Sequence, residues 1–174
     1  VGSGKTVVAA AAIYLAVRNG CQAVMMAPTE ILAEQHCKTL TAMLSPFGIN
    51  VALLAGKLTA AQKRSAKAGL ESGGIQVAVG TSALIQGDVV FNRLGLAVTD
   101  EQHRFGVLQR ADLISKAQNG SPHTLVMSAT PIPRTLSLIL YGDLDISVID
   151  ELPPGRKPIE TFALDETYRP RVNR

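Results

Sequence analysis

The chain alternates short runs of consecutive apolar residues with longer segments in which apolar residues recur at helical spacing. The short runs predict buried strands at residues 21–27, 49–55, 75–81, 94–100, 123–130 and 146–150. The longer segments predict helices at residues 6–20, from after Pro28 to about Leu44, and at 59–71, 105–117 and 131–142. The first of these helices is apolar nearly all round, which predicts burial on all sides. Because nearly continuous apolar strands separated by helices are typical of a mainly parallel sheet covered on both faces, we expect a three-layer α/β fold.

Composition supports one ordered domain and narrows the class of protein. The chain has 174 residues, of which 47% are hydrophobic and 18% charged, so it is long and apolar enough to bury a core. Its net charge of +3 is compatible with a nucleic-acid partner but does not require one. Two cysteines, Cys21 and Cys37, at a spacing that matches no zinc pattern, favour a reduced, cytoplasmic protein. No apolar run approaches the roughly 18 residues that predict a membrane span, and the first residues lack the features of a signal peptide.

The first six residues, VGSGKT, match the last part of a phosphate-binding loop, so we expect the chain to begin inside this loop of a longer protein. Gly2 and Gly4, with Ser3 between them, would let backbone N–H groups approach phosphate oxygens closely. Lys5 would place a charge near the β- and γ-phosphates, and Thr6 would offer its hydroxyl to Mg²⁺. The helix that follows presents its positive N-terminal end to the same anion. The structural alternative is a glycine turn that only precedes a helix.

A pair of acids, Asp100 and Glu101, ends the predicted strand at residues 94–100. Asp100 is placed to hold Mg²⁺ directly or through water, and Glu101 to accept a proton from an attacking water. An adjacent Asp–Glu pair favours an ATPase over a GTPase that positions its water with an amide. A solvated turn is the alternative for an acid pair alone, but the phosphate loop upstream favours the catalytic interpretation.

Four further segments follow VGSGKT in this order: APTEILAEQH, VGTSALIQ, DEQHRFGV and MSATPIPRT. Together the five resemble the first RecA-like motor domain of superfamily 2 helicases. Their residues are most similar to those of the RecG type. The resemblance implies a P-loop domain that binds ATP and Mg²⁺, and a parent enzyme that moves along duplex DNA and remodels stalled forks and Holliday junctions. It extends nearly to the end of the chain. It predicts a first motor domain at residues 1–151, then a linker and the start of a second motor domain at 152–174.

The resemblance also implies roles for individual residues. Lys5 and Thr6 match the Walker A lysine and threonine of these helicases. Asp100 and Glu101 match their Walker B pair. His103 matches a position that is expected to link the presence or absence of the γ-phosphate to the other motifs. The motif that couples hydrolysis to movement corresponds to Ser128, Ala129 and Thr130.

Two segments are expected to contact the nucleic-acid backbone. They are motif Ia, with Pro28, Thr29, Gln35 and His36, and motif Ib, with Gly80 and Thr81. Backbone N–H groups and small hydroxyls at helix N-termini bind phosphates without reading bases, as a motor that moves along any sequence requires. Helix N-capping is the alternative role for Thr29 and Thr81, and the two roles are compatible.

Two residues depart from the RecG-type pattern. Ser82 stands where a histidine is usual, and Thr99 stands where an aliphatic residue is usual, which is expected to weaken a buried strand end. Gln102 and His103 favour the RecG type over translocases of the transcription-repair coupling-factor (Mfd-like) type, the nearest alternative. An isolated nucleotide- or nucleic-acid-binding module without catalysis is the alternative from another class. The expected partners of this chain are a second motor domain, which would supply an arginine finger, and a junction-binding domain of the full-length protein. Because the sequence contains neither, we expect the chain alone to hydrolyse ATP negligibly.

Overall fold

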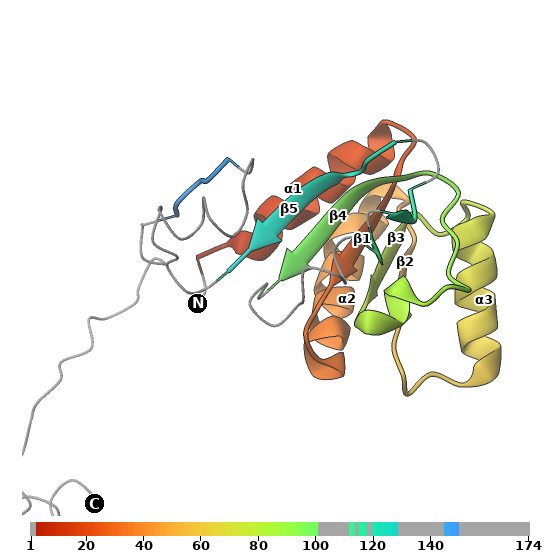
Figure 1. Cartoon of the computed structure of the whole chain (residues 1–174). Coiled ribbons are helices and arrows are strands. Elements are labelled where there is room, and N and C mark those ends of the chain that lie inside the picture. The colour runs from red at the N-terminus through yellow and green to blue at the C-terminus, as the bar shows by residue number, and fades with distance from the viewer. Residues whose placement is uncertain (1–2, 101–111, 114, 118–119, 129–144, 150–174) are drawn as a thin grey trace, which may run out of the picture.

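The computed structural model describes residues 3–100, 112–113, 115–117, 120–128 and 145–149. In the described part, five strands form a single sheet in the order β2-β3-β1-β4-β5, and every pair of neighbours is parallel. The strands are β1 (Gln22–Met26), β2 (Val51–Leu54), β3 (Val77–Gly80), β4 (Leu94–Asp100) and β5 (His123–Met127). The helices are α1 (Lys5–Arg18), α2 (Glu30–Leu44) and α3 (Ala60–Glu71), with short 3-10 turns η1 (Ser45–Phe47) and η2 (Ser82–Ile85). The predicted parallel α/β fold is confirmed (Figure 1).

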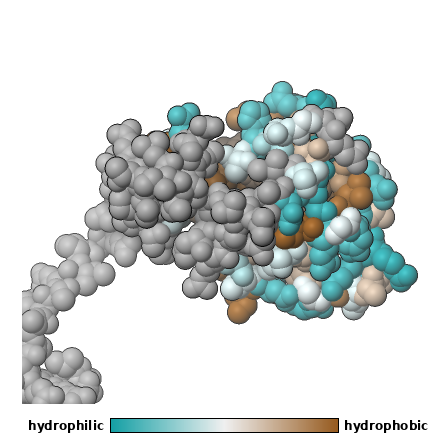
Figure 2. Space-filling model, in the orientation of Figure 1, coloured by the Kyte–Doolittle hydropathy of each residue, from teal (hydrophilic) through white to brown (hydrophobic). Residues whose placement is uncertain are grey.

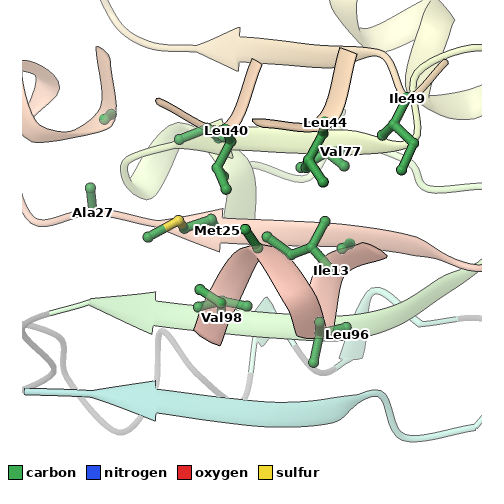
Figure 3. Packing of buried hydrophobic residues seen from close by; sticks show 14 of the residues in the cluster. Ile13, Met25, Ala27, Leu40, Leu44, Ile49, Val77, Leu96 and Val98 are labelled. Carbon is green, nitrogen blue, oxygen red and sulfur yellow. The ribbon is translucent and has the colours of Figure 1, made fainter. Parts of the chain in front are cut away.

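Alternate residues of β1 and β3 enter two separate cores, one on each face of the sheet. In β1, Ala23 and Met25 join the core beneath α1 and α2, whereas Val24 and Met26 join the core beneath α3. This alternation follows from the pleat of a strand, in which successive side chains point to opposite faces. Figure 3 shows the first core, with Ile13 of α1 close to Met25 in the middle of the sheet. Both faces are covered, and the third layer predicted from the sequence is present.

Helix α1 buries only one of its faces within the described part of the chain. Ala9, Ala10 and Ile13 are buried against the sheet, but Val7 and Leu15 remain 57% and 61% exposed. The sequence had predicted burial on all sides, and this expectation is not met by the described residues. Exposed apolar residues are otherwise scattered among hydrophilic ones on the face seen in Figure 2.

At the amino edge of the sheet, the buried side chain of Gln22 joins three segments. Its amide Nε2 donates to the carbonyl oxygens of Leu70 and Ile75, at 2.8 and 2.7 Å. Its Oε1 accepts from the backbone N–H of Arg93 at 3.1 Å. Because a buried amide costs free energy unless it is hydrogen-bonded, these contacts allow a polar side chain to lie inside the sheet. They fix the end of α3 and the approach to β4 against β1.

Three of the predicted elements are absent from the described residues or fall only partly within them. The predicted strand at 146–150 is wrong for residues 146–149, which are exposed and form no strand. A strand needs a neighbouring strand to pair with, and an apolar run alone does not provide one. The predicted helix at 131–142 lies outside the described residues, as does most of the predicted helix at 105–117, of which residues 112, 113 and 115 are helical. No helix in the described part is long and apolar enough to cross a membrane.

Candidate nucleotide site and nucleic-acid interface

The predicted phosphate loop and the acid at the end of β4 lie on the same edge of the sheet. The C-terminal end of α1 leads directly into the start of β1, so the N-terminal end of α1 lies toward the carboxyl ends of the parallel strands. Asp100 is the last residue of β4, and α1 packs on both β1 and β4. In Figure 1 the beginning of α1 lies beside the arrowheads of β4 and β5. Nucleotides bind at this edge of open α/β sheets.

The beginning of α1 leaves backbone donors available for an anion. Gly4 is its N-cap, with a φ of 84°, a left-handed conformation that favours glycine. It supplies no side chain to cap the first N–H groups, and the first turn carries no acidic residue. The Lys5 ammonium lies 3.4 Å from the Ser3 hydroxyl, and both side chains are half-buried. Uncapped N–H groups, the helix dipole and a lysine together favour phosphate at this position.

Asp100 is held by a residue that the sequence assigned to another role. The Nε2 nitrogen of His36 lies 2.8 Å from Asp100 Oδ2, and the exposed fractions of the two side chains are 11% and 14%. Because an ionised carboxylate can only accept, the imidazole must donate its Nε2 hydrogen in this contact. A carboxylate and a histidine separated by 64 positions are thus joined at the carboxyl edge.

His36 therefore differs from its expected place at the nucleic-acid surface. It lies on the buried face of α2, together with Ala33, Leu40 and Leu44, and only 8% of the whole residue is exposed. The imidazole points toward Asp100, so little of its surface is left to contact a phosphate of nucleic acid. The spacing of the buried residues along α2 could have placed His36 inside, but it could not have named its partner.

The residues at this edge fit a magnesium ion. Asp100 offers a carboxylate at a strand end, and Thr6 offers a hydroxyl in the first turn of α1, and Mg²⁺ prefers such oxygen donors. Mg²⁺ usually keeps several waters and uses only one or two protein ligands beside the phosphates. This explains why the described residues need no cluster of three or more acidic, histidine or cysteine side chains, and they contain none.

The segments of motifs Ia and Ib meet at the same edge as the candidate nucleotide site. Met26 pairs with Gly80 in the register of β1 and β3, and the N–H of Ala27 donates to the Gly80 carbonyl at 2.9 Å. This pairing brings the segments that follow the two strands, Pro28–Thr29 and Thr81, side by side. A Cβ at Gly80 would collide with the backbone carbonyl of Leu54, so the position requires glycine for packing.

The two threonines of these motifs differ in their local bonds. The hydroxyl of Thr29 accepts from the N–H of Leu32 at 3.3 Å and caps α2. Thr81 precedes η2 without a side-chain cap. Thr29 and Gln35 are exposed, whereas Thr81 and Pro28 are half-buried. Capping is therefore one role of Thr29 but not of Thr81, and a contact of either with nucleic acid stays a prediction.

The segment after motif Ib is held in place by two lysines. Lys116 donates to the carbonyl oxygens of Gln86 and Val89 at 2.6 and 2.9 Å, and burial lowers the pKa of its ammonium. Lys67 of α3 bonds Asp88, and this contact lowers the pKa of the Asp88 carboxyl. Both lysines thus bond groups within residues 86–89 rather than groups at the carboxyl ends of the strands. These bonds fix the path of the chain beyond Thr81.

Two residues beside the acid pair have local environments that bear on the prediction. Thr99 is 1% exposed, and its Oγ1 makes no hydrogen bond with any described residue, as expected for a polar substitute at an apolar strand end. Ser128 directly follows Met127, the residue that pairs with Asp100 between β4 and β5. The first residue of the predicted coupling motif therefore lies close to Asp100, at the edge of the candidate nucleotide site. The remaining predicted site residues, Gly2, Glu101, His103, Ala129 and Thr130, lie outside the described residues.

Comparison with known proteins identifies the family. The sequence profile of the DEAD/DEAH box helicases matches residues 1–139, most of the chain. The chain belongs to the DEAD/DEAH box helicase family. Within this helicase family it is 55% identical over 172 residues to the ATP-dependent DNA helicase RecG of Aquifex aeolicus. It is 52% identical over 171 residues to RecG of Escherichia coli K12. These matches cover 99% and 97% of this chain but only 22% and 25% of the relatives.

Solved structures of helicases give the same result. The structure of RecG bound to a three-way DNA junction matches 98% of this chain and 22% of that chain, with a TM-score of 0.83 at 48% identity. The helicase Lhr of Mycobacterium smegmatis bound to single-stranded DNA and AMP-PNP shares the fold, with a TM-score of 0.58 at 18% identity. That match covers 71% of this chain and 16% of Lhr. The predicted RecG-type resemblance is confirmed, and the coupling-factor alternative is not favoured.

Proposed function

We propose that this helicase chain forms the nucleotide-binding part of the first motor domain of a longer, ATP-dependent DNA helicase that remodels branched DNA. The observation that carries the proposal is the position of Asp100 at the carboxyl end of β4, on the edge where α1 begins with Lys5 and Thr6. Similarity to RecG over 99% of the chain supports branched DNA as the substrate and the bacterial cytoplasm as the location. Residues 152–174 would lead into the second motor domain.

In this proposal the reaction is the attack of water on the γ-phosphorus of ATP. The bond from phosphorus to the β–γ bridging oxygen breaks, and the products are ADP and phosphate. Glu101 accepts the proton of the attacking water, and Lys5 stabilises charge on the phosphate oxygens. Thr6 and Asp100 would hold Mg²⁺, which when bound supplies further stabilisation of that charge. Gly2, Ser3 and Gly4 would direct backbone N–H groups at the phosphates, and His103 would respond to the γ-phosphate.

We further propose that motifs Ia and Ib hold the backbone of the nucleic acid. The segments at Pro28–Thr29 and at Gly80–Thr81 are neighbours at the sheet edge, and Gln35 is exposed one turn into α2. Small hydroxyls and backbone N–H groups at helix starts suit phosphates of any sequence. Because His36 bonds Asp100, it is left out of this set. Ser128, Ala129 and Thr130 would then couple the nucleotide state to movement along DNA.

The test is nucleotide binding by the full-length protein with and without Lys5→Ala. Loss of the lysine removes a charge from the phosphates, so we expect the affinity for a fluorescent ATP analogue to fall at least about tenfold. Lys57→Ala is the matched control, since Lys57 is 54% exposed and pairs with Glu34. Unchanged binding in Lys5→Ala, or an equal loss in both variants, would contradict the assignment of the phosphate loop.

A further inference from the structure

We propose that His36 is a positioning residue for the nucleotide site, which holds the carboxylate of Asp100 in the orientation that receives Mg²⁺. This role rests on the proposed function of Asp100. The residue belongs to α2, which begins at the expected nucleic-acid motif, and neither the sequence nor the family resemblance assigns it to the nucleotide site.

The contact has the geometry of an orienting hydrogen bond. The atoms His36 Nε2 and Asp100 Oδ2 are 2.8 Å apart. This distance is short for a neutral N–H···O hydrogen bond and normal for one to a charged acceptor. Both side chains are nearly buried, at 11% and 14% exposed, so water competes little for the contact. A hydrogen bond in such surroundings is stronger than the same bond in water.

The two partners are held from opposite directions by rigid elements. Asp100 ends β4, a strand paired on both sides with β1 and β5. His36 lies in the middle of α2, whose Ala33 and Leu40 are fully buried on either side of it. Since neither backbone can shift easily, the bond fixes the rotation of the carboxylate about its own side chain. Carboxylates that hold metals are commonly oriented by such a second hydrogen-bonding group.

Simple packing of α2 does not account for a histidine at this position. The neighbouring positions on the buried face are filled by Ala33, Leu40 and Leu44, and an apolar residue would complete that face without the cost of burying a polar ring. The ring instead directs its N–H at the carboxylate that the site needs. A hydrogen bond to Oδ2 and a metal on the same carboxylate are compatible, because an ionised carboxylate has several lone pairs.

The experiment compares three substitutions of His36 in the full-length protein. Glutamine carries an N–H the same number of bonds from Cα as the imidazole Nε2, whereas the amide of asparagine is one bond shorter and cannot reach Asp100. His36→Ala removes the donor altogether. Leu40→Ala is the control for packing, because Leu40 lies on the same buried face and belongs only to the apolar core.

The readout is the binding of a fluorescent ADP analogue, titrated with Mg²⁺ and compared with binding in EDTA. In His36→Ala and His36→Asn we expect the Mg²⁺ concentration for half-maximal effect to rise about 10–100-fold. Binding in EDTA should stay unchanged, since the phosphate loop is intact. His36→Gln should remain within about threefold of wild type, and Leu40→Ala should lower thermal stability without changing the Mg²⁺ dependence. Adding His36→Asn to Asp100→Asn should cause no further loss.

Several outcomes would overturn the inference. They are an unchanged Mg²⁺ dependence in His36→Ala, equal losses in the glutamine and asparagine variants, and an equal effect of Leu40→Ala. Loss of the folded state in all three His36 variants would also overturn it, because the residue would then be needed for folding and not for orientation. Failure of the proposed function is distinct: wild type itself would then show no nucleotide binding that depends on Lys5 and Mg²⁺.

Discussion

Thr99 buries a hydroxyl in the middle of the sheet, one residue before the carboxylate of Asp100. Its Oγ1 is without a hydrogen bond among the described residues, and a buried donor left unpaired costs about 1–3 kcal/mol. Thr99→Val keeps the shape and removes the hydroxyl, so we expect the free energy of unfolding to rise by about 1 kcal/mol in urea denaturation. Thr124→Val on the neighbouring strand, where the residue is half-buried, should change it by less than about 0.5 kcal/mol. A loss of stability in Thr99→Val would show that the hydroxyl has a partner after all.

At the scale of single residues, sequence patterns name the residues expected at the nucleotide site but not the contacts that support them. Lys5, Thr6 and Asp100 belong to motifs whose chemistry requires those residue types, and their roles stay predictions. The sequence predicts that His36 contacts nucleic acid because it is the last residue of the motif Ia segment APTEILAEQH. Its partner is distant in the sequence, and only the crossing of α2 over the sheet brings the two together.

Among the helices, α3 has the most complete start. The hydroxyl of Thr59 accepts from the N–H of Gln62 at 3.2 Å, and the Gln62 side chain accepts from the N–H of Thr59 at 3.0 Å. This capping box satisfies two donors that would otherwise lack partners in the helix. It also explains why the polar segment at 59–71 forms a helix although few of its residues are buried.

We expect Thr59→Ala to lower the free energy of unfolding by about 1 kcal/mol, because the cap bond is lost. Denaturation of the full-length protein, followed by a probe in this domain, measures the change. Thr81→Ala is a matched control, since Thr81 precedes η2 without a side-chain cap and its loss should cost less. Equal effects of the two substitutions would mean that the cap contributes nothing.

The positions of most helices and strands could be predicted from the sequence. The pairing of one predicted strand and the burial of one helix could not. The strand LGLAVTD occupies residues 94–100 as predicted, because a buried parallel strand needs an unbroken apolar run. The run ISVID is also mostly apolar, yet residues 146–149 form no strand, since pairing depends on a neighbour that composition does not reveal. The exposed apolar residues of α1 likewise show that an apolar composition does not reveal which side of a helix is buried.

For the molecule as a whole, the class of fold followed from the sequence, whereas the order of the strands did not. The arrangement β2-β3-β1-β4-β5 places motifs Ia and Ib together and puts Asp100 beside them. Apolar runs report that strands are buried but not which strands are neighbours. The family resemblance implies the roles at this edge, and the register of β1 with β3 brings together the two segments that are expected to contact nucleic acid.

The chain spans 22–25% of the length of the RecG relatives named above, and this bears on its activity. We expect the 174-residue chain, produced by itself, to release phosphate from ATP at least about 10³-fold more slowly than the full-length protein. An arginine finger from a second motor domain is worth about 10³–10⁵ in the rate of phosphoryl transfer. A phosphate-release assay with saturating DNA measures both proteins. Similar turnover numbers would contradict the need for a second domain.

We expect the contacts of Gln22 to make the amino edge of the sheet open less readily than the carboxyl edge. At the amino edge, the N–H of Gln22 donates to the Arg93 carbonyl at 2.6 Å, while its own side chain accepts from the N–H of Arg93. We expect the backbone hydrogens of Gln22 and Arg93 to exchange with solvent only when β1 separates from the start of β4. Native-state hydrogen exchange should therefore find opening energies near that of global unfolding at this edge. Faster exchange at the opposite edge would mean that the residues around Asp100 can move while the fold stays closed.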